Sequence, residues 1–252
     1  MIMHNWLARP LGAIQKGTPW ILQRRMNSSR GVPVGVSDPA NTSNTSETLT
    51  YPEPPTSNHN SLPSFLEYAE RSGLNPKSTV YVGTHYEYLV AERLASYGFS
   101  LFRVGGASDY GIDLLGTWTV PSAPNPIKVI IQCKAIASKL GPSHVRELEG
   151  AFVGAPAGWR GSCVLGLLVG QQPATKGVRD SLGRSRWPMG YISFSTADGQ
   201  VSQIQWNRLA VNRGLDGMGV AVKYTEDGLP RLTLTMNGMS LPTGQLPRSE
   251  SK

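Results

Sequence analysis

Apolar residues along this chain are concentrated between about residues 80 and 236 and are sparse before residue 80. From residue 84 to residue 97 they recur at helical spacing, and Gly98 follows as a stop. Thr84 is a suitable N-cap residue, and Glu87 stands three positions later, as in a capping box. The pattern therefore predicts a helix over residues 84–97.

The periodicity then changes to that of β-strands. Strands are predicted over residues 100–104, 112–120 and 127–135, the last of which is rich in β-branched residues. A Gly-rich loop precedes the second strand, and Pro121 to Pro126 forms the turn before the third. If Asp113 faces Lys134 across this hairpin, Val120 pairs with Ile127 and the prolines occupy the turn.

The rest of the apolar region continues the alternation of helices and strands, and Val164 to Val169 is wholly apolar, as in a strand buried on both faces. This order predicts an α/β fold with a central mixed sheet flanked by helices and a C-terminal β extension. The further elements are helices at 64–70, 143–152, 174–182 and 207–212, and strands at 164–169, 189–195, 201–206, 220–224 and 231–236.

The composition divides the chain into four parts. Residues 1–36 are Arg-rich, lack acidic residues and contain interspersed apolar side chains, which is typical of a mitochondrial transit peptide. The alternative is a basic tail that contacts nucleic acid. Residues 37–62 are rich in Ser, Thr, Asn and Pro and are predicted to be a disordered linker. Residues 63–240 form the folded domain, and residues 241–252 a disordered tail.

Charge and cysteine content add little to this picture. The net charge is +7, but residues 1–37 supply +5 of it, so overall basicity says little about nucleic-acid binding by the folded part. Cys133 and Cys163 lie in apolar, strand-like runs without metal-ligand spacing and are interpreted as small buried residues of a reducing compartment. No apolar run is long enough to span a bilayer, so no membrane association is predicted.

The predicted hairpin brings together groups that suit a divalent cation. Asp113 offers a carboxylate, Gln132 an amide carbonyl and Cys133 a backbone carbonyl, which are the hard oxygen ligands that Mg²⁺ (or Mn²⁺) prefers. Lys134 is two residues beyond Gln132 and projects from the same strand face, where it would assist the attacking water or stabilise charge on a phosphate. The alternative for Asp113 and Lys134 is an inter-strand salt bridge.

Glu87 is a candidate second carboxylate, because it shares a helix face with apolar residues and its burial needs a partner: a water on the metal, or Lys134. Its competing role is the capping box. Asp109 is interpreted mainly as a residue that stabilises the Gly-rich turn. Glu147 and Glu149 are interpreted as surface or groove-lining residues. The cluster Lys176, Arg179, Arg184 and Arg186 is a candidate phosphate contact, with a solvated helix face as the alternative.

Two sets of residues resemble known families. The run Asp109-Tyr110-Gly111-Ile112-Asp113, followed by Gln132-Cys133-Lys134, resembles the Mrr-like branch of the restriction-endonuclease-like (PD-(D/E)XK) nucleases. The stretches 81–87 and 140–150 are similar to the fungal "required for respiratory growth" family of mitochondrial proteins. The resemblance covers about residues 80–238 and implies a restriction-endonuclease-like core, a mitochondrial location and a role in respiratory growth through maintenance of the mitochondrial genome. Its site residues would be Glu87, Asp113, Gln132 and Lys134.

We therefore expect a Mg²⁺-dependent DNA endonuclease of the mitochondrial matrix. The alternative is a catalytically inactive nucleic-acid-binding or assembly factor that retains the nuclease fold; the neutral ligand Gln132 favours this alternative, and an intact Lys134 argues against it. RNA is a second candidate substrate. Nucleases of this type often act as dimers, but the sequence shows no interface signal that decides between a monomer and a homodimer.

Overall fold

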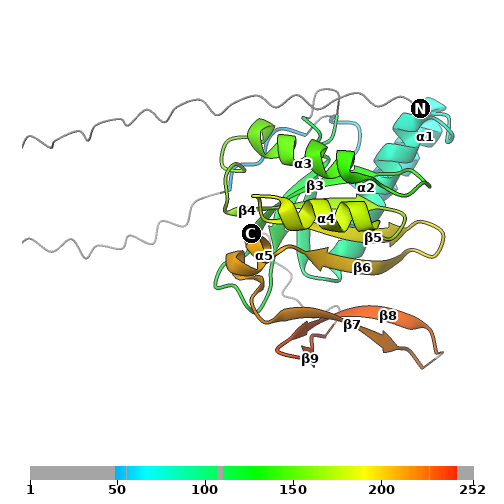
Figure 1. The fold of residues 1–252 in the computed structure, drawn as a ribbon. Coiled ribbons are helices and arrows are strands. Elements are labelled where there is room, and N and C mark those ends of the chain that lie inside the picture. The colour runs from blue at the N-terminus through cyan, green and yellow to red at the C-terminus, as the bar shows by residue number, and fades with distance from the viewer. Residues whose placement is uncertain (1–48, 55, 107–109, 227, 243–252) are drawn as a thin grey trace, which may run out of the picture. The chain divides into compact units, whose positions relative to one another are not determined.

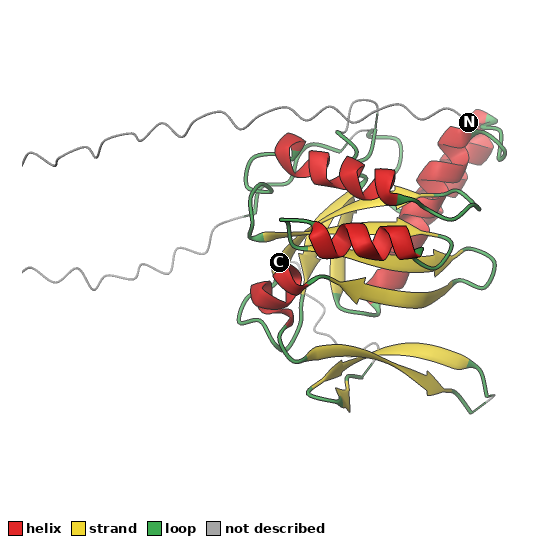
Figure 2. Ribbon diagram, viewed as in Figure 1, coloured by secondary structure: helices red, strands yellow, loops and turns green. Residues whose placement is uncertain are grey.

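The computed structural model describes residues 49–54, 56–106, 110–226 and 228–242. Figure 1 and Figure 2 show a β-sheet with helices on its faces, followed by a smaller C-terminal sheet. The helices are α1 (Leu62–Ser72), α2 (Thr79–Ala95), α3 (Pro142–Gly154), α4 (Lys176–Arg184) and α5 (Arg208–Ala210), which continues into a helical turn at Val211–Leu215. The strands are β1 (Phe99–Arg103), β2 (Leu114–Trp118), β3 (Ile127–Lys134), β4 (Val164–Gly170), β5 (Met189–Ser195), β6 (Gln200–Trp206), β7 (Met218–Tyr224), β8 (Pro230–Met236) and β9 (Met239–Ser240).

The main sheet has six strands in sequence order, from β1 to β6. Strands β1, β2 and β3 pair antiparallel, β3, β4 and β5 pair parallel, and β6 returns antiparallel to β5. The two parallel connections contain helices α3 and α4, because parallel neighbours need a crossover. The predicted α/β class with a mixed sheet and a C-terminal β extension is therefore confirmed.

The two faces of the sheet bury different sets of side chains. On β3, Val129 and Ile131 belong to the apolar cluster that includes residues of α2, whereas Ile130 belongs to the cluster that includes residues of α3 and α4. Successive residues of a strand point to opposite faces, so this alternation assigns α2 to one face and α3 and α4 to the other. All seven residues of β4 are buried, as predicted for a strand covered on both sides.

Helix α2 begins five residues earlier than the sequence pattern indicated, and the predicted capping box is wrong. The N-cap is Ser78, whose hydroxyl accepts a hydrogen bond from the backbone N–H of Tyr81. Thr84 lies inside the helix and is buried. Both serine and threonine are good N-cap residues, and the pattern could not choose between them. Glu87 therefore lies in the middle of α2, where it cannot satisfy the backbone groups of the first turn.

The C-terminal sheet has the order β7-β8-β9. It packs on the main domain through Leu232 and Leu234, which join the core cluster of α2 and the main sheet. The hydroxyl of Tyr97 donates a hydrogen bond of 3.1 Å to the carbonyl of Leu232. Strand β9 was not predicted. It follows a two-residue turn at Asn237 and Gly238, both with positive φ, as a tight hairpin requires.

Part of the predicted linker contacts the domain. The ring of Tyr51 lies 4.6 Å from the ring of Phe102, and the Trp159 indole nitrogen donates to the carbonyl of Thr50 at 3.0 Å. Helix α1 contains the predicted helix 64–70 and ends at Gly73, whose φ of 63° is left-handed. The proposed transit peptide, the linker up to residue 48 and the tail from residue 243 lie outside the described residues.

Two smaller findings complete the fold. Cys163 is exposed in the turn before β4, and Cys133 is partly buried in β3, so the interpretation of both cysteines as buried residues is wrong for Cys163. Because its side chain is in solvent, Cys163 contributes no core packing. Within the part of the chain that the structure describes, no helix is both long enough and apolar enough to cross a membrane.

Candidate functional site

The hairpin of β2 and β3 pairs in a different register from the one predicted. Leu114 lies opposite Ile131, and Trp118 lies opposite Ile127. The predicted pairs of Asp113 with Lys134 and of Val120 with Ile127 are therefore wrong, each by two residues. The connection is longer than the proline segment, because β2 ends at Trp118. A shift of two residues leaves every side chain on its predicted face, since side chains alternate with a period of two.

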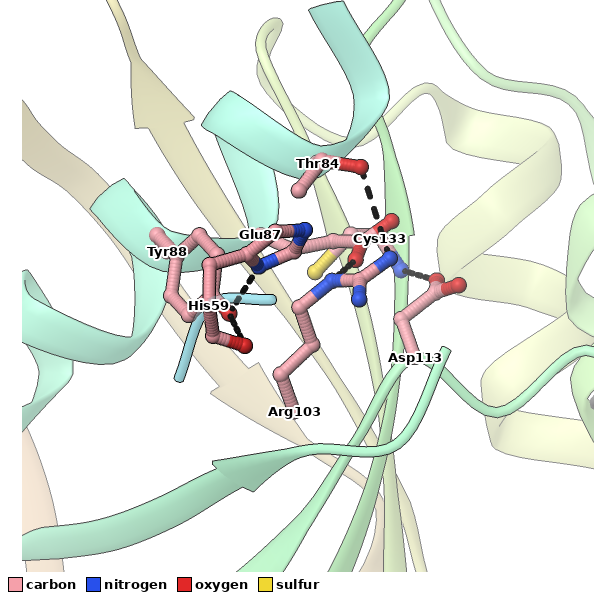
Figure 3. A network of polar contacts seen from close by, with 7 residues as sticks. All are labelled: His59, Thr84, Glu87, Tyr88, Arg103, Asp113 and Cys133. Atoms are coloured by element: carbon pink, nitrogen blue, oxygen red, sulfur yellow. Dashed lines mark hydrogen bonds and ion pairs between the residues drawn. The ribbon is translucent and has the colours of Figure 1, made fainter. Parts of the chain in front are cut away.

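Asp113 directly precedes β2, next to the last residues of β1 and β3, and Figure 3 shows it beside Cys133 of β3. Its backbone N–H donates to the carbonyl of Ile131 at 2.9 Å, and its own carbonyl accepts from Val104 and Gly105, also at 2.9 Å. Its carboxylate oxygen Oδ2 accepts the backbone N–H of Cys133 at 2.6 Å. That N–H lies between Gln132 and Lys134 along β3. The backbone thus fixes the Asp113 carboxylate beside the two other predicted site residues.

Glu87 approaches the same place from α2. A Cβ atom added to Gly105 would lie 3.2 Å from Glu87 Oε2 and 3.3 Å from Asp113 Oδ1. These two carboxylate oxygens are therefore at most about 6.5 Å apart. The absence of a side chain at Gly105 leaves the space that they share. The predicted convergence of Glu87 with Asp113 is consistent with this geometry.

Arg103, the last residue of β1, is the cation that partners Glu87. Arg103 Nε lies 2.5 Å from Glu87 Oε2, and both side chains are 12% exposed. The guanidinium also donates to the hydroxyl of Thr84 at 3.4 Å and stands 5.8 Å from the centre of the Tyr88 ring. Arg103 is thus a partner of Glu87 that the sequence analysis did not name, and stabilisation of Glu87 by Lys134 or by a metal-bound water stays a prediction. A basic residue at a strand end next to the Gly-rich loop was the only sequence signal for this role.

Figure 3 shows a further layer of this network. The hydroxyl of Tyr88 lies 2.8 Å from Nδ1 of His59 and donates to the His59 carbonyl at 3.3 Å. Burial, and then the positive charge of Arg103, lower the pKa of His59. Both causes favour the neutral form of the His59 imidazole, which lies next to Tyr88 and near the buried ion pair. The segment before α1 therefore helps to fix the residues around Glu87.

Gln132 is the least satisfied polar residue of the site. It is 5% exposed, and its Oε1 has no hydrogen-bond partner among the described residues. Its amide nitrogen lies against Gly111, where a Cβ would come within 2.8 Å of Nε2; the φ of Gly111 is +78°. A buried carbonyl oxygen without a partner costs about 1–3 kcal/mol. A ligand at this oxygen would offset that cost.

Lys134 pairs with a residue that the sequence did not assign to the site. Its ammonium lies 2.8 Å from Glu147 of α3, with side-chain exposures of 27% and 47%. The hydrogen bond from Lys134 lowers the pKa of Glu147, and the nearby His144 contributes in the same direction. Gln132 and Lys134 are two residues apart on β3 and therefore share the face that α3 covers. Lys134 is partly accessible and sits at the edge of the site.

The pKa of the Cys133 thiol is affected by three charged residues of the site. Burial raises its pKa well above the ordinary value, and the negative charges of Asp113 and Glu87 add to the increase. The positive charge of Lys134 acts in the opposite direction. Burial and these two carboxylates therefore favour the protonated form of the thiol.

The donor set suits a hard cation. In the described part of the chain, no group of three or more His, Cys, Asp or Glu residues could hold a metal ion. The predicted set does not need one, since it consists of Asp113, the Gln132 carbonyl and the Cys133 backbone carbonyl. Mg²⁺ often uses one or two protein carboxylates and keeps several waters. The buried Gln132 oxygen without a partner among the described residues, one residue before the N–H that Asp113 binds, is the observation that favours this fit.

The other candidate residues lie elsewhere. Thr175 caps α4 as predicted, accepting from the N–H of Val178 at 3.2 Å. Lys176 pairs with Asp180 at 2.6 Å, and Arg179 donates to the carbonyl of Ala174, also at 2.6 Å. The cluster Lys176, Arg179, Arg184 and Arg186 is exposed, and phosphate binding by it stays a prediction. Asp109 lies outside the described residues.

Comparison with known proteins identifies the class. The family described as "Required for respiratory growth protein 7" matches residues 78–125 and 120–224, which is more than half of this chain. The protein belongs to this family. The resemblance to a fungal respiratory-growth family is thereby confirmed. No solved structure matches the chain.

Relatives cover the same region. The chain is 33% identical to an uncharacterized mitochondrial protein of Schizosaccharomyces pombe, over 61% of each protein. It is 30% identical to the mitochondrial Required for respiratory growth protein 7 of Saccharomyces cerevisiae, over 36% of this chain and 54% of that protein. It is 24% identical to the Zygosaccharomyces rouxii protein of the same name, over 64% of this chain and 80% of that protein. The chain thus spans between half and two thirds of the first two relatives. Their names agree with the predicted mitochondrial location; the matrix stays a prediction.

Proposed function

We propose that this protein is a Mg²⁺-dependent nuclease of mitochondria with a restriction-endonuclease-like core, acting on DNA in support of respiratory growth. The proposal is supported by the order α2-β1-β2-β3-α3-β4 and by the residues at the ends of β2 and β3. The observation that carries it is the buried Gln132 oxygen, which lacks a partner among the described residues and belongs to the residue just before the backbone N–H that Asp113 binds.

The roles of the residues follow from their chemistry. Asp113 and Gln132, with the Cys133 carbonyl, would hold the cation. A bound Mg²⁺ supplies charge neutralisation at the phosphate and activation of water. Lys134 is partly exposed, and its ammonium would exchange Glu147 for a phosphate oxygen. Glu87 would act through water, with its carboxylate oriented by Arg103.

A second function is favoured by the two ion pairs. Glu87 is bound to Arg103, and Lys134 to Glu147, so two of the proposed catalytic groups are neutralised by side chains of the protein itself. A nucleic-acid-binding factor without turnover would leave these pairs intact. Gln132 in place of an acidic ligand also lowers the negative charge at the cation site, and with it the affinity for the metal.

A cleavage assay separates the two functions. The full chain is incubated with plasmid, linear and single-stranded DNA, and with RNA, in Mg²⁺ or Mn²⁺. A nuclease loses cleavage in Asp113→Ala and Lys134→Ala but retains DNA binding. The matched controls are Asp216→Ala and Lys139→Ala, which replace exposed residues of the same types. Cleavage that is equal in all variants comes from a contaminant, and binding without cleavage in the wild type establishes the second function.

A further inference from the structure

A pocket of about 270 Å³ lies beside the candidate site and belongs to none of the roles above. It opens where β3, β4 and β5 end: Ala135 follows β3, Gln171 follows β4 and Thr196 follows β5. Helix α2 forms the other wall, through Tyr81, Val82 and His85. In open α/β sheets, ligands bind outside the carboxyl ends of parallel strands, so this position is a usual one for a ligand.

The pocket and the candidate site share two elements at consecutive positions. Ala135 lines the pocket and directly follows Lys134; Tyr86 lines it and directly precedes Glu87. These neighbouring residues point in different directions, because strands alternate faces and helix positions turn by 100°. The pocket is therefore adjacent to the candidate site along both β3 and α2.

The walls of the pocket suit a flat heteroaromatic group. The rings of Tyr81 and His85 are stacked, with centroids 5.6 Å apart and planes at 23°. Burial lowers the pKa of His85, which keeps the imidazole neutral near pH 7. Val82 remains 40% exposed and adds an uncovered apolar surface. Stacking on rings and aliphatic groups is the mode by which proteins hold unpaired bases.

Gln171 supplies the polar element. Its Oε1 accepts the hydroxyl of Thr196 at 2.9 Å, which orients the amide. Its amide nitrogen has no hydrogen-bond partner among the described residues and can donate to the edge of a base. The pocket is also too small for a duplex, since its volume is just below the roughly 300 Å³ at which drug-sized sites begin.

We propose that this pocket binds one unpaired nucleobase of the strand whose phosphate lies at the candidate site. The proposal rests on the proposed function for the position of that phosphate, but not on cleavage. It implies a preference for single-stranded or locally opened DNA over intact duplex.

Binding is measured by fluorescence anisotropy in EDTA, with the full chain and a labelled single-stranded 12-mer, together with the same oligonucleotide carrying one abasic position at each site in turn. Gln171→Ala and His85→Ala should each weaken binding of the intact strand about tenfold, near the low end of base stacking energies. The wild type should bind the strand that lacks the base of the pocket about tenfold more weakly than the intact strand. The two variants should bind this abasic strand and the intact strand with nearly equal affinity. Gln172→Ala is the matched control, because the contact of Gln172 uses its backbone carbonyl.

The same penalty for the abasic strand in wild type and in both variants would overturn the proposal, as would a wild type that does not bind the strand. Gln171→Ala is included because His85 lies in helix α2 and its replacement could disturb folding, whereas Gln171 lies outside the helices. Cleavage is scored separately in Mg²⁺. If the pocket variants lose the penalty for the abasic strand but the wild type does not cleave, the proposed nuclease activity is refuted and the proposed base-binding pocket stands. If the wild type cleaves but the abasic penalty is the same in all proteins, the nuclease activity stands and the base-binding pocket is refuted.

Discussion

The ion pair of Arg103 and Glu87 should be the most costly polar contact to break. Both side chains are 12% exposed, and the two atoms in contact are 2.5 Å apart. Replacing Arg103 by Met keeps an unbranched apolar stem but removes the cation from a largely buried carboxylate. Removing one partner of a buried pair costs about 3–5 kcal/mol. Because the pair retains some exposure, we expect about 3 kcal/mol, or a fall of about 6–12 °C in Tm.

Chemical denaturation of the wild type, Arg103→Met, Glu87→Gln and the double variant would measure this coupling. The double variant carries neither charge of the pair and should be more stable than Arg103→Met. Lys176→Met is the matched control: it breaks an exposed pair with Asp180, with side-chain exposures of 83% and 40%, and should cost less than about 0.5 kcal/mol. If Arg103→Met costs no more than Lys176→Met, or if the two single losses simply add, the reasoning is refuted.

Three further predictions concern the fold. Gly116→Ala should destabilise the protein by about 3 kcal/mol or more, because the new Cβ would lie 1.9 Å from the Ser100 carbonyl oxygen; Gly150→Ala, with no atom within 4 Å, should be neutral or stabilising in a urea titration. The free energy of unfolding should fall as the pH goes from 7 to 5, because the unfolded chain protonates His59 more readily than the folded one; His59→Gln should flatten this slope, and an unchanged slope would argue against the role of His59. An alkylating reagent should modify exposed Cys163 faster than Cys133, which is partly buried and whose thiol has a raised pKa, and equal rates by mass spectrometry would contradict this difference.

Elements with strong local patterns could be predicted from the sequence. The β-branched run at residues 127–134 and the apolar run at 164–170 both form strands, with starts at the predicted residues. The start of α2 could not be placed, because Ser78 and Thr84 are both competent N-caps and the helix tolerates Gly83 between them. The hairpin at Asn237-Gly238 had a recognisable turn signal that the prediction did not use.

The sequence predicted where the site lies better than it predicted which side chains pair with one another in it. The start of β2 and the end of β3 were correctly placed together, and an error of two residues in register did not change the faces. The partners of Glu87 and Lys134 come from β1 and α3, so they depend on how these elements pack on the sheet. No local spacing in the sequence encodes such contacts, which is why Arg103 and Glu147 were not assigned.

The central claim is that Asp113 and Gln132 hold a divalent cation, and Mn²⁺ binding to the full chain, followed by electron paramagnetic resonance, tests it most directly. We predict that the wild type binds Mn²⁺, that Asp113→Asn abolishes this binding and Gln132→Ala weakens it, and that Asp216→Asn leaves it unchanged. Binding that is equally strong in Asp113→Asn and Asp216→Asn, or no binding by the wild type, would contradict the claim.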